Sequence, residues 1–197
     1  LSAAALGVTA LALAAGGNVI LSGLGTGSGT STGEIIIRYG TSIAAAVPSG
    51  AVIVGVKVTI SRANSSASGT IRDQTVTLVG LTGPTPVNKA DLVSVWPLSS
   101  AYANATYGGV ADTWGSQLKT EDVRSADFGI KIAAQQTPAT TICAASIDAV
   151  TVEVTYTGQT QKVYVRRGAT DITSSNTVHS TIDNGETFAN TLAEGTI

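Results

Sequence analysis

A stretch of alternating residues near the middle of the chain constrains the fold more than any other feature. Residues 47–62 read VPSGAVIVGVKVTISR. Pro48-Ser49-Gly50 predicts a turn, because proline presets φ and glycine accepts a positive φ. After the turn, apolar β-branched residues alternate with small or polar ones, and this period of two predicts a half-buried β-strand. The face that we expect to be buried carries Val54, Val56, Val58 and Ile60.

A second alternating stretch lies far downstream, in residues 147–156. Its apolar positions are Val150, Val152, Val154 and Tyr156, and its other face carries threonine and glutamate. Two half-buried strands of this length are expected to pair. We therefore predict that 47–62 and 147–156 form the middle of one sheet.

The rest of the chain predicts further short strands separated by turn residues. Residues 120–123 predict a single helical turn that begins with a hydroxyl N-cap and two acids. No longer amphipathic helix is expected, which argues against α/β folds, because these need helices between parallel strands. Roughly eight to ten short strands favour an antiparallel β-sandwich or jelly roll. The strand signals lie in residues 8–13, 18–21, 34–39, 52–62, 70–81, 128–132, 144–156 and 162–166. An alanine-driven helix is the alternative near the N-terminus. Residues 92–96 form an apolar segment that Pro97 ends, and residues 101–109 carry two tyrosines and end in two glycines.

Composition shifts divide the chain into three predicted parts. Residues 1–33 are an N-terminal strand or arm followed by a Gly/Ser/Thr-rich connector. Residues 34–157 form the β-sandwich domain. Residues 158–197 carry too few apolar side chains for a core of their own, so we expect a C-terminal β extension or an assembly arm. The candidate contact residues of this arm are Val163, Val165, Phe188 and Leu192.

The charge of the chain is low and limits its partners. Charged residues make up 12% of the sequence, about half of the ~25% of ordinary soluble domains. A surface with few charges opposes self-association weakly, which fits an assembly subunit or an extracellular protein, and an ordinary soluble β domain of low charge fits equally well. The net charge is −2 and the longest basic run is Arg166-Arg167, so we expect no nucleic-acid partner. Residues 1–17 lack a basic leader and are too short for a membrane span, which we do not expect.

Candidate catalytic and metal-binding residues are sparse. Residues 29–33 match the nucleophile-elbow pattern G-x-S-x-G around Ser31, and Asp148 and His179 follow in hydrolase order. That pattern works only between a strand and a helix, whereas here a Gly/Ser/Thr-rich loop precedes it and a predicted strand follows. His179 is the only histidine and has polar neighbours, and no D-x-D-x-D calcium loop occurs. We therefore expect no enzyme, no cofactor and no metal.

Several segments of the chain resemble those of one known β-rich domain. Residues 47–60 resemble its I-P-S-G-A-x-I-x-G-I-x-V-x-I strand. Trp96-Pro97 and residues 107–115 (YGGVADTWG) look like its tryptophan-glycine loop, and residues 127–130 and 145–152 resemble later strands. The domain that these segments resemble occurs in tailed-phage structural proteins, and the resemblance covers about residues 34–157. It implies a virion component of the capsid exterior or tail, without catalytic residues.

Trp96, Asp112 and Trp114 are the candidate site residues of this loop. We expect them to have a structural role rather than to bind a ligand. Trp114 would fill one end of the sandwich, and Asp112 would accept hydrogen bonds from turn amides.

The sequence thus predicts a non-enzymatic structural protein of a phage-like virion, which decorates the capsid or forms part of a fibre or tail. The expected partners are further copies of the chain, for example in a trimer, and virion proteins such as the major capsid protein. The expected location is the virion surface or the extracellular space. The alternative is a secreted carbohydrate-binding or adhesin-type module, which would be a monomer with an aromatic or calcium site. A hydrolase, the third possibility, would lose activity on Ser31→Ala.

Overall fold

The computed structural model describes residues 5–11, 19–21, 31–64, 69–98, 101–137 and 143–158, which all belong to one compact unit, Leu1–Gly158. Strands dominate these residues, and the two helices are short, which confirms the all-β prediction. The elements in chain order are β1 (Ala5–Leu11), β2 (Val19–Leu21), β3 (Ile35–Arg38), α1 (Gly40–Ala46), β4 (Val52–Asn64), β5 (Ile71–Val79), β6 (Ala103–Gly108), α2 (Thr120–Val123), β7 (Gly129–Gln136) and β8 (Ala145–Thr157).

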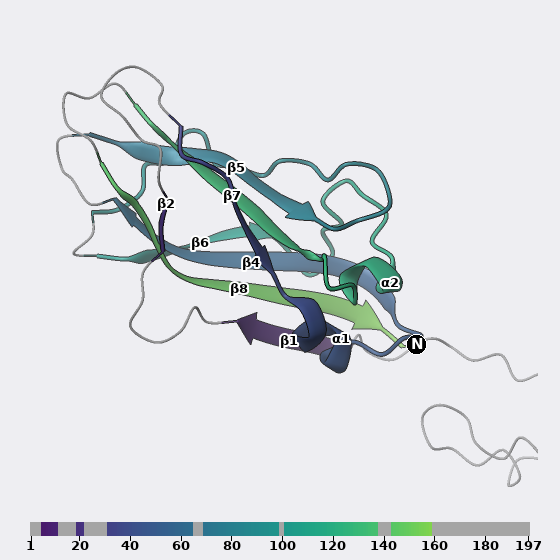
Figure 1. Ribbon diagram of the computed structural model, residues 1–197. Coiled ribbons are helices and arrows are strands. Elements are labelled where there is room, and N and C mark those ends of the chain that lie inside the picture. Colours follow the sequence, from purple (N-terminus) through teal and green to yellow (C-terminus); the bar gives the residue numbers. More distant parts are fainter. Residues whose placement is uncertain are drawn as a thin grey trace, which may run out of the picture. The chain divides into compact units, whose positions relative to one another are not determined.

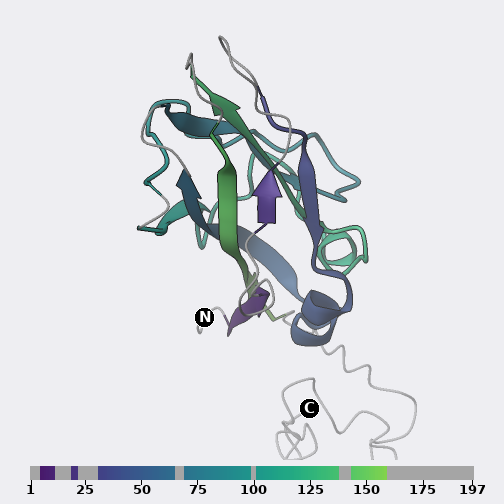
Figure 2. The same ribbon diagram turned by 60° about the vertical axis from the view of Figure 1, so that its left-hand side comes forward.

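The strands form two antiparallel sheets that pack as a sandwich (Figures 1 and 2). The first sheet has the order β1-β8-β4-β6, with β2 also paired to β8, and the second has the order β3-β7-β5. Apolar side chains of both sheets are buried in one hydrophobic cluster. Its strand members include Val56, Val58, Ile60, Val150, Val152 and Val154 from the first sheet and Ile37, Ile71, Val76, Leu78, Ile130 and Ile132 from the second.

The strand order is that of a jelly roll in which the fifth strand is irregular. In an eight-stranded jelly roll, the first strand lies beside the eighth, the eighth beside the third and the third beside the sixth. The other sheet has the second strand beside the seventh, then the fourth and the fifth. With β1, β3, β4 and β5 in the first four positions and β6, β7 and β8 in the last three, both observed orders fit. Only the fifth position lacks a strand among the described residues.

Residues 87–98, called here the 87–98 segment, run along the edge of β5 where that fifth strand would lie. The amide of Lys89 donates to the carbonyl of Val76 over 2.8 Å, and the amide of Trp96 donates to the carbonyl of Ile71, also over 2.8 Å. These two bonds run in opposite directions along the two chains, so the segment is antiparallel to β5. At its far end, Leu98 forms a parallel bridge with Asn64 at the end of β4. The segment therefore covers the edge of the second sheet and reaches the first.

The predicted central pair is confirmed: β4 and β8 are the two inner strands of the first sheet and pair antiparallel from Val52↔Thr157 to Asn64↔Ala145. One detail of the predicted alternation is wrong. The register shifts between Ile53 and Gly55, so Ile53 is buried while Val54 is only half-buried. A bulge inserts an extra residue and reverses the faces on one side of it, and period-two reading cannot reveal this.

Both helices differ in part from expectation. The predicted turn at 120–123 is confirmed as α2, but its predicted hydroxyl cap is wrong, because Lys119 is the N-cap and makes no side-chain capping bond. The Thr120 hydroxyl instead donates to the carbonyl of Ala51. Helix α1 was not predicted. It contains three consecutive alanines, the best helix formers, and ends before Pro48, where Val47 adopts an extended conformation.

The three predicted parts of the chain are described to different extents. Strands β1 and β2, which lie in the range 1–33, pair with β8 in the first sheet. Residues 159–197 lie outside the described residues, and so do the four candidate contact residues Val163, Val165, Phe188 and Leu192. Among the residues that the structure describes, no helix is both long and apolar enough to cross a membrane.

Candidate functional site

Four buried side chains from different parts of the sandwich form one group centred on the carboxylate of Asp73. We call this group the Asp73 cluster. Arg62 comes from β4, Asp73 from β5, Tyr107 from β6 and Trp96 from the 87–98 segment. Asp73 is 1% exposed and Arg62 6% exposed, so this ion pair lies inside the protein. Because β4 and β6 belong to one sheet and β5 to the other, the cluster connects both sheets.

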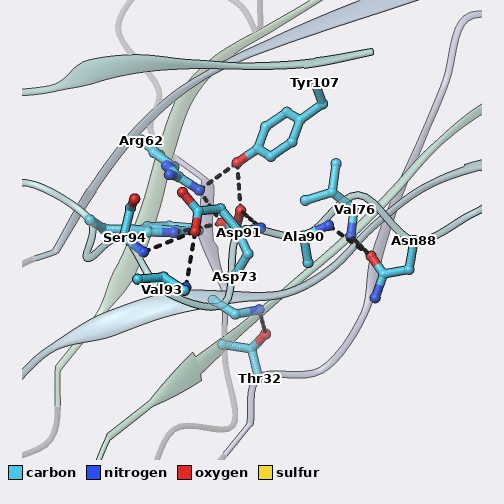
Figure 3. Close-up of polar contacts among 12 residues, drawn as sticks. Thr32, Arg62, Asp73, Val76, Asn88, Ala90, Asp91, Val93, Ser94 and Tyr107 are labelled. Carbon is cyan, nitrogen blue, oxygen red and sulfur yellow. Dashed lines mark hydrogen bonds and ion pairs between the residues drawn. The ribbon is translucent and has the colours of Figure 1, made fainter. Parts of the chain in front are cut away.

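Hydrogen bonds within the Asp73 cluster converge on the carboxylate (Figure 3). The Arg62 guanidinium donates to Oδ1 of Asp73 and also to the Tyr107 hydroxyl oxygen. The Tyr107 hydroxyl donates to Oδ2 over 2.7 Å, and the indole N–H of Trp96 donates to Oδ1 over 2.8 Å. The backbone amide of Asp91 adds a bond of 2.9 Å to Oδ2. Each carboxylate oxygen thus has two donors.

This convergence explains how the protein tolerates a buried ion pair. Burying two charges costs more than their attraction returns unless additional hydrogen bonds satisfy both groups. The Arg62 guanidinium carbon also lies 5.2 Å from the Trp96 ring centroid and 5.7 Å from that of Tyr107, as in cation–π contacts. Burial, together with the negative charge of Asp73, raises the pKa of the Tyr107 hydroxyl. The tyrosine therefore stays protonated and acts as a donor.

Asp91 extends the cluster into the 87–98 segment (Figure 3). While its amide binds Asp73, its own Oδ1 accepts the amides of Val93 and Ser94, each over 2.9 Å. Hydrogen bonds from the Ser94 hydroxyl and from these two amides lower the pKa of Asp91 to about 2. Asn88 connects the segment to β5, because its Oδ1 accepts the amide of Val76 over 2.9 Å. These side chains hold the segment in a fixed irregular conformation.

The second candidate region surrounds Trp114, whose side chain is fully buried. Its indole N–H donates to the carbonyl of Val56 on β4 over 2.8 Å, and its amide donates to Oδ1 of Asp112 over 2.7 Å. Trp114 has a φ of 56°, a left-handed conformation that is costly for a residue with a Cβ. The Asp112 side chain and the Val56 carbonyl stabilise this conformation. Asp112 thus accepts a turn amide in the described structure.

Lys89 connects the Trp114 region to the 87–98 segment. Its Nζ lies 2.8 Å from Oδ2 of Asp112 and 5.5 Å from the centroid of the Trp114 ring. The hydrogen bond from Lys89 is the main cause that lowers the pKa of Asp112 below its usual range. The amide of Val87 also donates to the carbonyl of Trp114 over 2.7 Å. One segment therefore binds both candidate regions.

Trp96, Asp112 and Trp114 were predicted to belong to one loop, but they lie in two different regions of the structure. Trp96 belongs to the Asp73 cluster, whereas Asp112 and Trp114 interact with each other and with β4. Sequence reasoning missed Arg62 and Asp73. A signal was present at Arg62, because it continues the alternation of the buried residues of β4 and so occupies an inward position for a charged side chain.

The nucleophile-elbow pattern does not produce an elbow. Ser31 forms a bridge with Gln135 and is followed by β3 rather than by a helix. Asp148 is exposed on β8, and His179 lies outside the described residues. In the described part of the chain, no three His, Cys, Asp or Glu side chains lie close enough together to hold a metal ion. In comparisons with known proteins, no family model, curated protein or solved structure matches this chain.

Proposed function

We propose that this chain is a non-enzymatic structural protein of a phage-like virion, which decorates the capsid exterior or forms part of a fibre or tail. The observation that carries this proposal is the structural role of the residues that resemble the phage motif. Those that resemble the phage loop, Trp96, Asp112 and Trp114, all hold the sandwich together.

The architecture supports the same proposal. Jelly rolls are frequent among viral capsid domains, and the strand order here fits that fold with one irregular position. The Asp73 cluster joins both sheets and the 87–98 segment through hydrogen bonds in which each carboxylate oxygen of Asp73 has two donors. Such a connection suits a rigid building block. Low charge weakens the repulsion between neighbouring copies on a particle.

The rival function, a secreted carbohydrate-binding or adhesin-type module, also occurs on jelly rolls. Such a module stacks sugars on accessible aromatic rings. Both tryptophans of this chain are buried, Trp96 at 3% exposure and Trp114 at 0%, and both indole N–H groups donate to protein oxygens. Neither ring is available as a sugar platform, so we favour the virion role.

Antibody labelling of particles tests the virion role. Antibodies raised against the purified chain are applied to density-purified phage particles from the strain that carries the gene, and the particles are viewed by electron microscopy. We expect gold label at a fixed position on head or tail, and loss of label when purified chain is added as a competitor. Absence of the chain from intact particles, with binding of the purified chain to a glycan array, would show the rival function instead.

Light scattering tests the predicted assembly arm. The mass of the full chain is compared with that of a chain truncated after residue 157, with circular dichroism as the check of folding. An oligomer that falls to monomer on truncation assigns the contact to the arm. Equal oligomers in both cases assign it to the sandwich.

A further inference from the structure

The 87–98 segment concentrates the exposed apolar side chains of the described structure. In the described structure as a whole, eight large apolar side chains are exposed. Five of them belong to the 87–98 segment. They are Val87 (53%), Leu92 (60%), Val93 (80%), Val95 (48%) and Leu98 (46%). Single exposed apolar residues are ordinary, but several on one short segment indicate a contact surface.

These side chains are held in place by the rest of the protein. The amides of Lys89 and Trp96 donate to carbonyls of β5. The amide of Asp91 donates to Asp73, and the side chain of Asp91 accepts the amide of Val93. Trp96 points inward and is the one buried residue of the segment. The outward residues are therefore presented on a fixed backbone, and binding a partner would cost little ordering entropy.

The 87–98 segment and β6 themselves carry few charged residues. Between residues 84 and 110 the sequence has only two charged residues, Lys89 and Asp91. Lys89 pairs with Asp112, and Asp91 accepts two backbone amides. An apolar surface with few charges is matched best by a partner surface that is also apolar and carries few charges.

Strand β6 continues this surface into the first sheet. Its Tyr107 hydroxyl binds Asp73 of β5, so the edge of the first sheet at β6 lies on the same side as the 87–98 segment. In the described structure β6 pairs only with β4. Exposed edge strands are usually protected by a charge or a proline, and β6 has neither in its sequence ANATYG.

We propose that the surface formed by the 87–98 segment and β6 is where a second copy of this chain docks. The proposal rests on the proposed function of an assembling subunit and names its partner and its contact surface. A second copy offers the same apolar surface with few charges, so two copies meet with little repulsion, as in an isologous contact. Residues 159–197, the other candidate occupant, carry seven charged residues, among them Lys162 and the Arg166-Arg167 pair, and match the surface less well.

The test places a charge in this surface of the full chain and compares it with the same change elsewhere. Val93→Lys introduces an ammonium group at the most exposed residue of the segment. Ile36→Lys is the matched control, because Ile36 is 42% exposed on β3, at the opposite edge of the second sheet. Sedimentation velocity over a concentration series gives the dissociation constant of each oligomer. We expect Val93→Lys to weaken association by at least about tenfold and Ile36→Lys to leave it unchanged.

Thermal unfolding confirms that both variants remain folded, which is expected for exposed positions. The proposal is overturned if the wild-type chain is a monomer at high concentration, or if Val93→Lys and Ile36→Lys associate equally well. A chain that labels virions but is unaffected by Val93→Lys would keep the virion role and refute only this contact surface. A chain that oligomerises through Val93 but is absent from particles would refute only the virion role.

Discussion

At the scale of single residues, two buried tyrosines differ in what their hydroxyl groups bind. Tyr107 donates to Asp73 and accepts from Arg62, whereas the Tyr39 hydroxyl has no partner among the described residues. We predict that Tyr107→Phe lowers the free energy of unfolding by about 1.5–3 kcal/mol, because a hydrogen bond to a buried charged group is lost. Urea unfolding followed by tryptophan fluorescence measures this.

Tyr39→Phe is the matched control for that experiment. It removes the same atom from a residue that is 3% exposed, against 6% for Tyr107, but it breaks no bond in the described structure. The free energy of unfolding should change by less than about 0.5 kcal/mol or increase. Equal losses in the two variants would show that the hydrogen bonds of the Asp73 cluster contribute nothing beyond burial.

The limits of sequence reasoning are also visible at single residues. Both tryptophans could be assigned structural roles, because large aromatic residues in a strand-rich chain seek burial. Asp73 could not be identified, since a carboxylate on a predicted strand is ordinarily placed on the solvent side. Its burial depends on Arg62, Trp96 and Tyr107, which are distant in sequence and meet only when both sheets have formed.

At the scale of elements, the turn from residue 109 to 112 packs directly on β4. A Cβ on Gly55 would lie 2.6 Å from the amide nitrogen of Asp112 and 2.7 Å from the carbonyl oxygen of Gly109. These are backbone atoms and cannot rotate away. We predict that Gly55→Ala displaces this turn and lowers the free energy of unfolding by about 1–3 kcal/mol, as overpacking does. Thermal or urea unfolding measures the loss.

Gly109→Ala provides the comparison within the same turn. A Cβ on Gly109 would meet nothing within 4 Å, so this variant should unfold within about 0.5 kcal/mol of the wild type. If Gly55→Ala were as stable as Gly109→Ala, close packing of the turn on β4 would not be needed for stability.

Elements with strict alternation were predicted well, and irregular ones were not. The pattern of β4 and β8 depends only on which side chains face the core, so the sequence contains it directly. The 87–98 segment has apolar residues at 92, 93, 95 and 96, which suggested an apolar stretch but not its orientation. The Asp91 side chain accepts the amides of Val93 and Ser94, which a regular strand would use for pairing. This local hydrogen bonding competes with strand pairing and leaves Leu92, Val93 and Val95 exposed.

At the scale of the whole molecule, the fold class followed from the number and spacing of short strands, but the strand order did not. Period-two patterns define which face of a strand is buried and leave its neighbours open. The jelly-roll order arises because successive strands from β3 to β8 alternate between the two sheets, and nothing local in the sequence encodes that alternation. The irregular fifth position became visible only from its hydrogen bonds to β5.

The buried tyrosines also make the stability of the whole molecule depend on alkaline pH. Burial raises the pKa of Tyr39 and is the main cause that raises that of Tyr107, whereas tyrosines of an unfolded chain ionise near pH ~10. Above that pH the unfolded state loses two protons that the native state keeps. Stability is therefore fully present below pH ~10 and falls as the pH rises above it, by at most about 2.7 kcal/mol per pH unit. Urea unfolding at a series of pH values between about 9 and 11 measures this slope.

The double variant Tyr39→Phe/Tyr107→Phe should have a clearly flatter slope, since its unfolded state has lost both hydroxyl groups that titrate. A slope as steep as that of the wild type would mean that other groups cause the alkaline transition and that neither hydroxyl is protected from ionisation by the core.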